Sequence, residues 1–368
     1  LVLSHALYEA GNEEEASREL AATKRAVAQT GSFYFEYLYA LTEAYFEDGR
    51  GDENAALESL QKAMTLGRQK GFTTHLYFWR PAVMSRLCGK ALEAGIEIDY
   101  AQNIIRKLNL VPDEQSMGIE TWPWPVKIFL LGRFEIFVDG KPVQFSGKVQ
   151  KKPLLLLKAL VALGKGEAKA EKLEDLLWPE SDGDVAHQSF ETTLHRLRKL
   201  IGHPNALDFS SGLAALNRGV CWTDVWAFEK LLEEAGKQER QGRVDRAVDF
   251  TDKAVSLYKG MFLPGETGES WTVSPRERLR RKFLGAVHWL GHHWEEAGEW
   301  EKALSCYDRG LQVDDISEEF YERMMICYHR LGRIAQALDT YERCKRVLSA
   351  VLGVKPSPRT EAVRKSLL

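Results

Sequence analysis

The feature that most constrains this chain is a repeat of 34 residues toward its C-terminus. Three residues recur at that interval, namely Gly298, Ala303 and Tyr307 as Gly332, Ala337 and Tyr341. This period is typical of tetratricopeptide repeats, in which glycine marks the turn inside a helical hairpin and small or aromatic residues pack between helices. A looser copy begins at Gly242. The repeat predicts stacked helical hairpins over residues 225–368.

The first part of the chain, residues 1–110, also has the pattern of short helices joined by tight turns. The predicted breaks are at Gly11, Gly31, Gly49-Arg50-Gly51, Gly71 and Gly95. Helices of this kind, joined by short connections, favour antiparallel neighbours. We expect a second tetratricopeptide-like region here, although it shows no 34-residue register.

Prolines separate this region from the next one. Pro112 follows Val111, and residues 122–125 have the sequence Trp-Pro-Trp-Pro. Proline lacks an amide hydrogen and keeps the residue before it out of the helical conformation. Residues 111–125 are therefore predicted to be a linker, whose tryptophans hold it against a neighbouring surface.

The periodicity changes at residue 126. Lys127–Val138 is rich in β-forming residues, Asp139-Gly140 is a hairpin signal, and Val143–Phe145 is the predicted return strand. Three helices and a second hairpin are expected to follow, at Leu154–Leu163, Glu171–Trp178, Val185–Ile201, Leu207–Phe209 and Leu213–Leu216. This order predicts an α+β winged helix over residues 126–224. The chain as a whole is predicted to be mainly α, with helical repeats flanking that domain.

The charge and the cysteines exclude several classes of protein. The 50 Lys and Arg residues nearly balance the 53 Asp and Glu residues, which excludes a globally basic protein but not a local basic patch. No apolar run approaches the roughly 18 residues that cross a bilayer, and no signal peptide is recognisable. The five cysteines form no CxxC pair, which favours reduced thiols. We expect a cytoplasmic fragment of a longer protein, without membrane contact.

No pattern of catalytic residues is found, so we expect no enzymatic activity, no cofactor and no metal. The segment Gly260–Thr267 resembles a phosphate-binding loop but has Glu266 in place of the required lysine. His288, His292 and Glu296 stand at helical spacing and could hold a metal. A polar helix face is favoured instead, because no cysteine or fourth ligand is near.

The third predicted helix of residues 126–224, Val185–Ile201, carries the pattern that is most informative about function. At about 100° per residue, an apolar stripe is predicted to face the core: Phe190, Leu194, Leu197 and Ile201. The opposite face carries polar and basic side chains: Gln188, Thr192, His195, Arg196 and Lys199, with Ser189, Thr193 and Arg198 on its flanks. Such side chains contact base edges and phosphates. The alternative is a solvated charged face.

Two observations weigh against tight DNA binding. Residues 126–224 contain 14 Lys and Arg against 12 Asp and Glu, a net charge of only +2. The turn of the second hairpin, Ser210-Ser211-Gly212, carries no basic residue and lies beside Asp208. Phosphate affinity should therefore be modest, and a monomer should bind weakly.

Together these segments resemble a known arrangement of domains. The OmpR/PhoB-type winged helix of the antibiotic regulatory protein family is similar to Leu131-Gly-Arg-Phe-Glu-Ile, Lys152-Pro-Leu-Leu-Leu-Leu-Lys-Ala-Leu, Leu176-Leu-Trp-Pro and Thr193-Leu-His-Arg-Leu-Arg-Lys-Leu. The bacterial transcriptional activator domain of that family is similar to Asp224-Val-Trp-Ala-Phe-Glu, the 34-residue repeats and Leu352-Gly-Val-Lys-Pro-Ser-Pro. The resemblance covers about residues 126–368.

The resemblance implies a transcriptional activator that binds double-stranded promoter DNA and contacts RNA polymerase. It implies that Arg196 contacts a base. It implies phosphate or flanking-base contacts for Gln188, Ser189, Thr193, His195 and Arg198. The loop 179–184, with Glu180, Ser181 and Asp182, corresponds to the family's polymerase contact. The hairpin tip lacks the family's basic residue, and Arg218 is the nearest replacement.

The N-terminal helices are similar to the tetratricopeptide sensor region of large signal-transduction ATPases. That similarity implies a nucleotide-binding part upstream of this chain and an effector, either a protein or a small molecule, that binds the repeats. We also expect a homodimer on DNA. The alternative is a helical-repeat scaffold for protein interactions, whose winged helix docks a protein rather than DNA. Retardation of promoter DNA would separate the two hypotheses.

Overall fold

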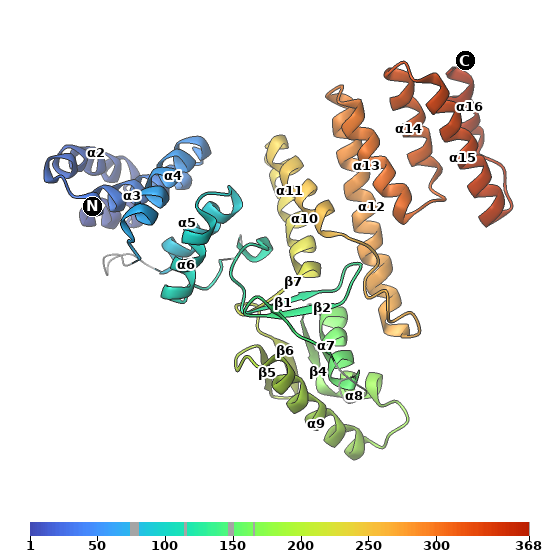
Figure 1. Cartoon of the computed structure of the whole chain (residues 1–368), viewed down its shortest axis with the longest axis horizontal. Helices are drawn as coiled ribbons and strands as arrows, with labels where there is room; N and C mark the ends of the chain where they lie inside the picture. The colour runs from blue at the N-terminus through green and yellow to red at the C-terminus, as the bar shows by residue number, and fades with distance from the viewer. Residues whose placement is uncertain (74–80, 114–115, 146–150, 165, 368) are drawn as a thin grey trace. The chain divides into compact units, whose positions relative to one another are not determined.

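The computed structural model is mainly helical (Figure 1). It describes residues 1–73, 81–113, 116–145, 151–164 and 166–367. These residues divide into two compact units. The first unit comprises Leu1–Pro125 and Arg218–Trp222, and the second comprises Val126–Asn217 and Thr223–Leu368.

The first unit consists of consecutive helical hairpins. Its helices are α1 (Val2–Glu9), α2 (Glu13–Thr30), α3 (Phe33–Arg50), α4 (Glu53–Lys70), α5 (Pro81–Glu93) and α6 (Ile98–Leu108). The three sequential pairs pack as α1 with α2, α3 with α4, and α5 with α6. The predicted breaks are confirmed, since each falls at the end of a helix. Gly51, for example, ends α3 with a φ of 81°, a left-handed conformation that favours glycine.

The predicted linker packs against the helices of the first unit. Ser85 of α5 donates a hydrogen bond to the Val111 carbonyl, and Gln102 of α6 donates one to the Thr121 carbonyl at 2.8 Å. Trp122 and Trp124 are both buried, as predicted. The Trp124 indole donates to the carbonyl of Ile119 at 2.8 Å. The described part of the linker, which includes η1 (Ser116–Gly118), therefore belongs to the packed structure of α5 and α6.

The second unit begins with an antiparallel meander. Its strands are β1 (Val126–Phe129), β2 (Glu135–Val138) and β3 (Lys141–Pro142). The predicted return strand is present, but it is Lys141–Pro142 rather than Val143–Phe145, because pairing already begins at Lys141, opposite Val138. The Val143 amide still donates to the Ile136 carbonyl at 2.8 Å. Asp139 and Gly140 both have positive φ, which is the conformation of a two-residue hairpin loop. Such a loop pairs the residues on either side of it directly.

The three predicted helices and the second hairpin follow in order. They are α7 (Lys151–Gly164), α8 (Ala170–Leu177), α9 (Gly183–Ile201), β5 (Leu207–Ser210) and β6 (Leu213–Leu216). An unpredicted strand, β4 (Glu167–Lys169), pairs with β6 and gives the strand order β4-β6-β5. The chain continues into the short strand β7 (Cys221–Thr223).

The predicted core stripe of α9 is confirmed. Phe190, Leu194, Leu197 and Ile201 are all buried. Phe190 contacts Phe209 of β5 edge to face, with ring centroids 5.4 Å apart. The helix ends at Gly202, which has a φ of 70°. These contacts fix which face of α9 points outward.

From residue 224 to residue 367, the last one described, seven α-helices complete the second unit. They are α10 (Asp224–Arg240), α11 (Val244–Leu257), α12 (Val273–Glu296), α13 (Trp300–Val313), α14 (Glu318–Arg330), α15 (Ile334–Leu352) and α16 (Pro358–Ser366), with η3 (Ser270–Thr272) before α12. Figure 1 shows α12 to α16 as successive antiparallel helices. The repeat explains the packing, since Ala247, Ala303 and Ala337 are fully buried. No helix within the described ranges is long and apolar enough to cross a membrane.

The end of β1 and the start of α10 are joined by a buried carboxylate. Asp224 Oδ2 accepts hydrogen bonds from the amides of Leu130 and Leu131, both at 2.9 Å, and Oδ1 also accepts from Leu130. Asp224 is only 2% exposed. Burial raises its pKa to about 7, while the hydrogen bonds from Leu131 and Leu130 act in the opposite direction.

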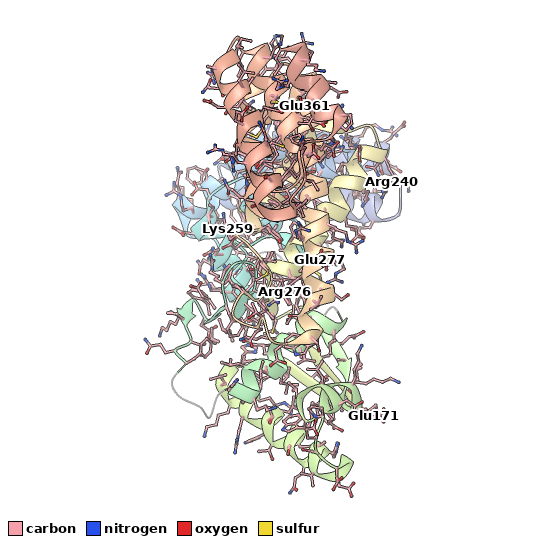
Figure 2. The ribbon with its side chains drawn as sticks, turned by 90° about the vertical axis from the view of Figure 1, so that its right-hand side faces the viewer. Glu171, Arg240, Lys259, Arg276, Glu277 and Glu361 are labelled. Carbon is pink, nitrogen blue, oxygen red and sulfur yellow. The ribbon has the colours of Figure 1, made fainter. Side chains whose placement is uncertain are left out.

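The loop before η3 completes this junction between the meander and the helices. The Leu263 amide donates to the Leu130 carbonyl at 2.9 Å, and the Gly132 amide donates to the Met261 carbonyl at 3.0 Å. A Cβ on Gly132 would lie 2.7 Å from the Lys259 backbone, so no larger residue fits there without a shift. Arg276 of α12 donates to the Phe262 carbonyl and anchors the loop (Figure 2).

A buried ion pair lies beside the same loop. Lys158 of α7 pairs with Glu266, and its ammonium group lies 4.0 Å from the centre of the Phe134 ring. Lys158 is only 8% exposed, and a buried lysine of this kind requires a partner. The glutamate that replaces the lysine of a phosphate-binding loop is thus engaged by α7.

Candidate nucleic-acid interface

The outer face of α9 displays the polar residues that the sequence placed there. Five of the predicted contact residues are exposed on this face: Gln188, Thr192, His195, Arg196 and Lys199. Within the described residues, neither Arg196 nor Lys199 forms an ion pair. Their charges are therefore available to an anionic ligand.

The flanks of this face differ from the expectation. Arg198 is exposed, and its Nε donates to the Leu207 carbonyl of β5 at 3.4 Å. Ser189 is half-buried. Thr193 is only 5% exposed, so its predicted place on the exposed flank is wrong. It lies four residues before Leu197 and three after Phe190, on the margin of the buried stripe.

One acid of this helix, Glu191, lies near a histidine that also contacts α8. Glu191 lies 3.7 Å from His187 Nε2, and His187 Nδ1 lies 2.8 Å from Glu174 of α8. The hydrogen bond and the charge of Glu174 raise the pKa of His187. The two carboxylates are thus engaged with His187, at the α8 side of α9.

The loop between α8 and α9 exposes its acidic side chains. Glu180, Ser181 and Asp182 are all exposed. The Asp182 backbone carbonyl accepts from the Ala186 amide at 2.8 Å and so begins α9, but its side chain makes no capping hydrogen bond. Asp182 is thus the N-cap residue of α9 by position, as the sequence pattern allows for Asp182 or Asp184, but its carboxylate accepts no capping hydrogen bond.

The hairpin β5–β6, which we call the wing, turns at two residues of positive φ, Ser211 and Gly212. Strand β6 runs from this tip toward Leu216. Arg218 is exposed and follows the opposite end of β6, within the first compact unit. Its predicted place near the wing tip is therefore wrong, because the strand leads the chain away from the tip.

The histidines weighed as metal ligands each pair with a different carboxylate. His288 Nε2 lies 3.1 Å from Glu319 of α14, and His292 Nδ1 lies 3.6 Å from Glu296. In the part of the chain that the structure describes, no group of three or more potential metal ligands is found. The polar-face interpretation fits these contacts.

The helices that follow the wing provide the most direct comparison with known proteins. They begin at α10, contain the 34-residue repeat and end at α16. A protein-family model matches this region, and the match begins two residues before the boundary at residue 225 that the sequence predicts. Residues 223–368 match the bacterial transcriptional activator domain.

The curated relatives of this chain are regulatory proteins by name. The regulatory protein AfsR of Streptomyces griseus is 26% identical over 258 residues, which is 70% of this chain and 26% of AfsR. The regulatory protein DnrI of Streptomyces peucetius is 29% identical over 146 residues, 40% of this chain and 54% of DnrI. This chain thus spans about a quarter of the length of AfsR.

A solved structure supports the fold of about two thirds of this chain. Mycobacterium tuberculosis EmbR, solved in complex with a low-affinity phosphopeptide, aligns with a TM-score of 0.52 and 20% identity. The alignment covers 66% of this chain and 65% of EmbR. At this identity the likeness concerns the fold alone.

Proposed function

We propose that this chain is part of a transcriptional activator of the antibiotic regulatory protein type, which binds promoter DNA through α9. The observation that carries the proposal is the outward face of α9. It presents unpaired basic and amide side chains opposite a buried apolar stripe, beside a hairpin, in a chain that continues into a bacterial transcriptional activator domain. A winged helix of this form inserts its third helix into the major groove.

The side chains on this face suit different parts of a duplex. Arg196 lies opposite the core stripe, at the centre of the exposed face, and its guanidinium can contact two acceptors of a guanine at once. Gln188 and Thr192 can contact base edges, and Lys199 can hold a phosphate. Arg198 is a flanking phosphate contact in this proposal, which its bond to β5 holds in place.

The modest charge of residues 126–224 shapes how the protein binds. A net charge of +2 gives little sequence-independent affinity. We therefore propose that two copies bind together on DNA as a homodimer. The proposed role is the binding of promoter DNA and RNA polymerase, which requires no chemical step, so we propose no enzymatic activity. We propose a cytoplasmic location, because both partners lie there in bacteria.

Activation is assigned to the loop 179–184 and RNA polymerase. Glu180 and Asp182 are exposed acids that would repel phosphates, and they lie at the start of α9. With α9 in the groove, this loop is available to a protein bound to the neighbouring DNA. The Asp182 side chain supports this role, because its carboxylate accepts no capping hydrogen bond from the start of α9.

Residues 1–110 are proposed to be a sensor region that binds a protein or small-molecule effector. The support is their arrangement as consecutive helical hairpins, which form extended binding surfaces in repeat proteins. Because the chain covers about a quarter of AfsR, we propose that it belongs to a larger regulator of the signal-transduction ATPase type.

The alternative remains a scaffold whose winged helix docks a protein. The low net charge and the wing tip without a basic residue favour it. Binding of the full chain to duplexes selected from a random pool separates the two proposals. Selection of a recurrent sequence supports the activator, whereas equal binding of all duplexes or none supports the scaffold.

Two variants of α9 test the assignment of its residues. Arg196→Ala should lose about 1–3 kcal/mol of discrimination at one base pair of the selected site. Lys199→Ala should weaken binding to all sequences about equally. Both changes are on the exposed face, so folding should be unaffected. If Arg196→Ala leaves both affinity and base preference unchanged in a binding titration, Arg196 does not contact a base.

A further inference from the structure

The wing tip lacks a basic residue of its own, but the strand beside it supplies one. In the ladder between β4 and β6, Lys169 pairs with Leu213, the residue that follows the tip. The Ala170 amide donates to the Gly212 carbonyl at 2.8 Å, which fixes the start of α8 against the tip. Lys169 is thus a neighbour of the turn, although 43 residues separate it from Gly212 in the sequence.

The register also determines which way Lys169 points. Ala168 and Ala214, which pair with each other, are buried beneath the sheet. Successive residues of a strand point to opposite faces, so Lys169 and its partner Leu213 lie on the outer face, and both are exposed. Ser210 of β5 pairs with Leu213 and completes this exposed row.

A second lysine lies one helical turn further on. Lys172 is in the first turn of α8 and is exposed, as is Glu171 beside it. Within the described residues, neither Lys169 nor Lys172 forms an ion pair. The positive end of the α8 dipole adds to the two charges.

This corner lies at the same end of the second unit as the proposed DNA-binding helix. Figure 1 shows β4, α8 and α9 at the end of the unit that is remote from α14 to α16. Figure 2 shows Glu171 at that end too, far from Glu361 of α16. Helix α8 packs against both α9 and β4, so the lysine corner and α9 belong to one packed body.

We propose that Lys169 and Lys172 contact the phosphate backbone of the duplex beside the wing, and so supply the charge that the wing tip lacks. This inference rests on the proposed DNA-binding function. The contact carries no sequence information, because an ammonium group binds a phosphate as a point charge. The corner therefore sets affinity and its dependence on salt, whereas α9 sets base preference.

Salt dependence measures this contact directly. Each phosphate that a protein neutralises contributes about 0.9 to the slope of log affinity against log salt, because bound counterions are released. Replacing both lysines by glutamine should reduce that slope by about 2, with no change in the preferred sequence. The single variants should each reduce it by about 1.

The experiment uses the full chain and fluorescence anisotropy with a labelled duplex selected by the wild-type protein. The variants are Lys169→Gln/Lys172→Gln, the charge-conserving Lys169→Arg/Lys172→Arg, and the control Lys141→Gln. Lys141 is an exposed lysine of β3, in the other sheet of the same unit. Circular dichroism checks that each variant is folded, and the arginine variant shows whether charge alone restores binding.

A smaller slope for the glutamine double variant only, with wild-type behaviour of the arginine variant and the control, supports the inference. An unchanged slope for the glutamine variant overturns it, as does an equal reduction for Lys141→Gln. These results leave the proposed function standing, because wild-type binding is still observed. Failure of the wild-type chain to bind any duplex at low salt overturns both.

Discussion

The buried carboxylate of Asp224 offers a quantitative test of how the second unit is held together. Its oxygens accept hydrogen bonds from the backbone amides of Leu130 and Leu131, and both leucines are buried. Asp224→Ala removes the acceptor. The two buried N–H groups of Leu130 and Leu131 then lose the hydrogen-bond partner that this side chain provides. An unsatisfied buried group costs about 1–3 kcal/mol, so the variant should be less stable by about 2–6 kcal/mol.

The loss should depend on pH in a defined direction. Because burial raises the pKa of Asp224 from 3.8 to about 7, the neutral carboxyl is favoured in the folded chain. A raised pKa stabilises the fold fully below the unfolded value, and the contribution is lost as pH rises through the folded value. The difference between wild type and Asp224→Ala should therefore be larger at pH 5 than at pH 8.5, by about 3 kcal/mol at most, because about two pH units separate pH 5 from the folded value.

Urea unfolding of the full chain at both pH values, followed by tryptophan fluorescence and circular dichroism, measures this difference. Asp249→Ala is the matched control, because Asp249 is exposed on α11 and pairs with Lys253 at 2.7 Å. An exposed pair of this kind contributes at most about 1 kcal/mol. If Asp224→Ala lowers the free energy of unfolding by no more than the control does, the Asp224 hydrogen bonds do not stabilise the second unit as argued. A difference that grows from pH 5 to pH 8.5 would show that the hydrogen bonds outweigh burial.

Two further predictions concern the core and the loop of the proposed DNA-binding domain. Leu197→Ala should destabilise the second unit by about 2–5 kcal/mol, since Leu197 is fully buried, and an unchanged denaturation midpoint would contradict the packing. Glu180→Lys should keep or slightly tighten promoter binding, because it removes an exposed negative charge, while lowering transcription in a reconstituted assay. Transcription that follows DNA occupancy in that variant would place the polymerase contact outside this loop, on residues 225–368.

The helices were predictable because local pattern and burial agree in them. Every member of the apolar stripe of α9 is buried, and the helix ends at the glycine expected to end it. The 34-residue repeat located the turns of the C-terminal hairpins for the same reason. At Gly298 and Gly332 the chain adopts the positive φ that a helical turn of this kind requires.

The features that the sequence did not predict depend on strand register or on residues far apart in the chain. Strand β4 has three residues, too few for an alternating pattern, so the position of Lys169 beside the wing tip follows only from its pairing with β6. Asp224 was part of a recognised motif, but its bonds reach residues 93 and 94 positions earlier. Thr193 was misplaced because it lies at the edge of the buried stripe, where a wheel of 100° steps gives no firm answer.

The junction built by Asp224 and the loop 259–269 has a consequence for promoter architecture. Since it joins the domain that contains α9 to the helices of the activator domain within one compact unit, docking α9 also sets the angle of those helices around the DNA axis. A duplex turns once in about 10.5 base pairs. On our proposal, promoters served by this protein would therefore tolerate insertions of a whole turn between operator and polymerase site, and would fail with insertions of half a turn. This spacing requirement would depend on the Asp224 carboxylate and on Gly132, neither of which contacts DNA in our proposal.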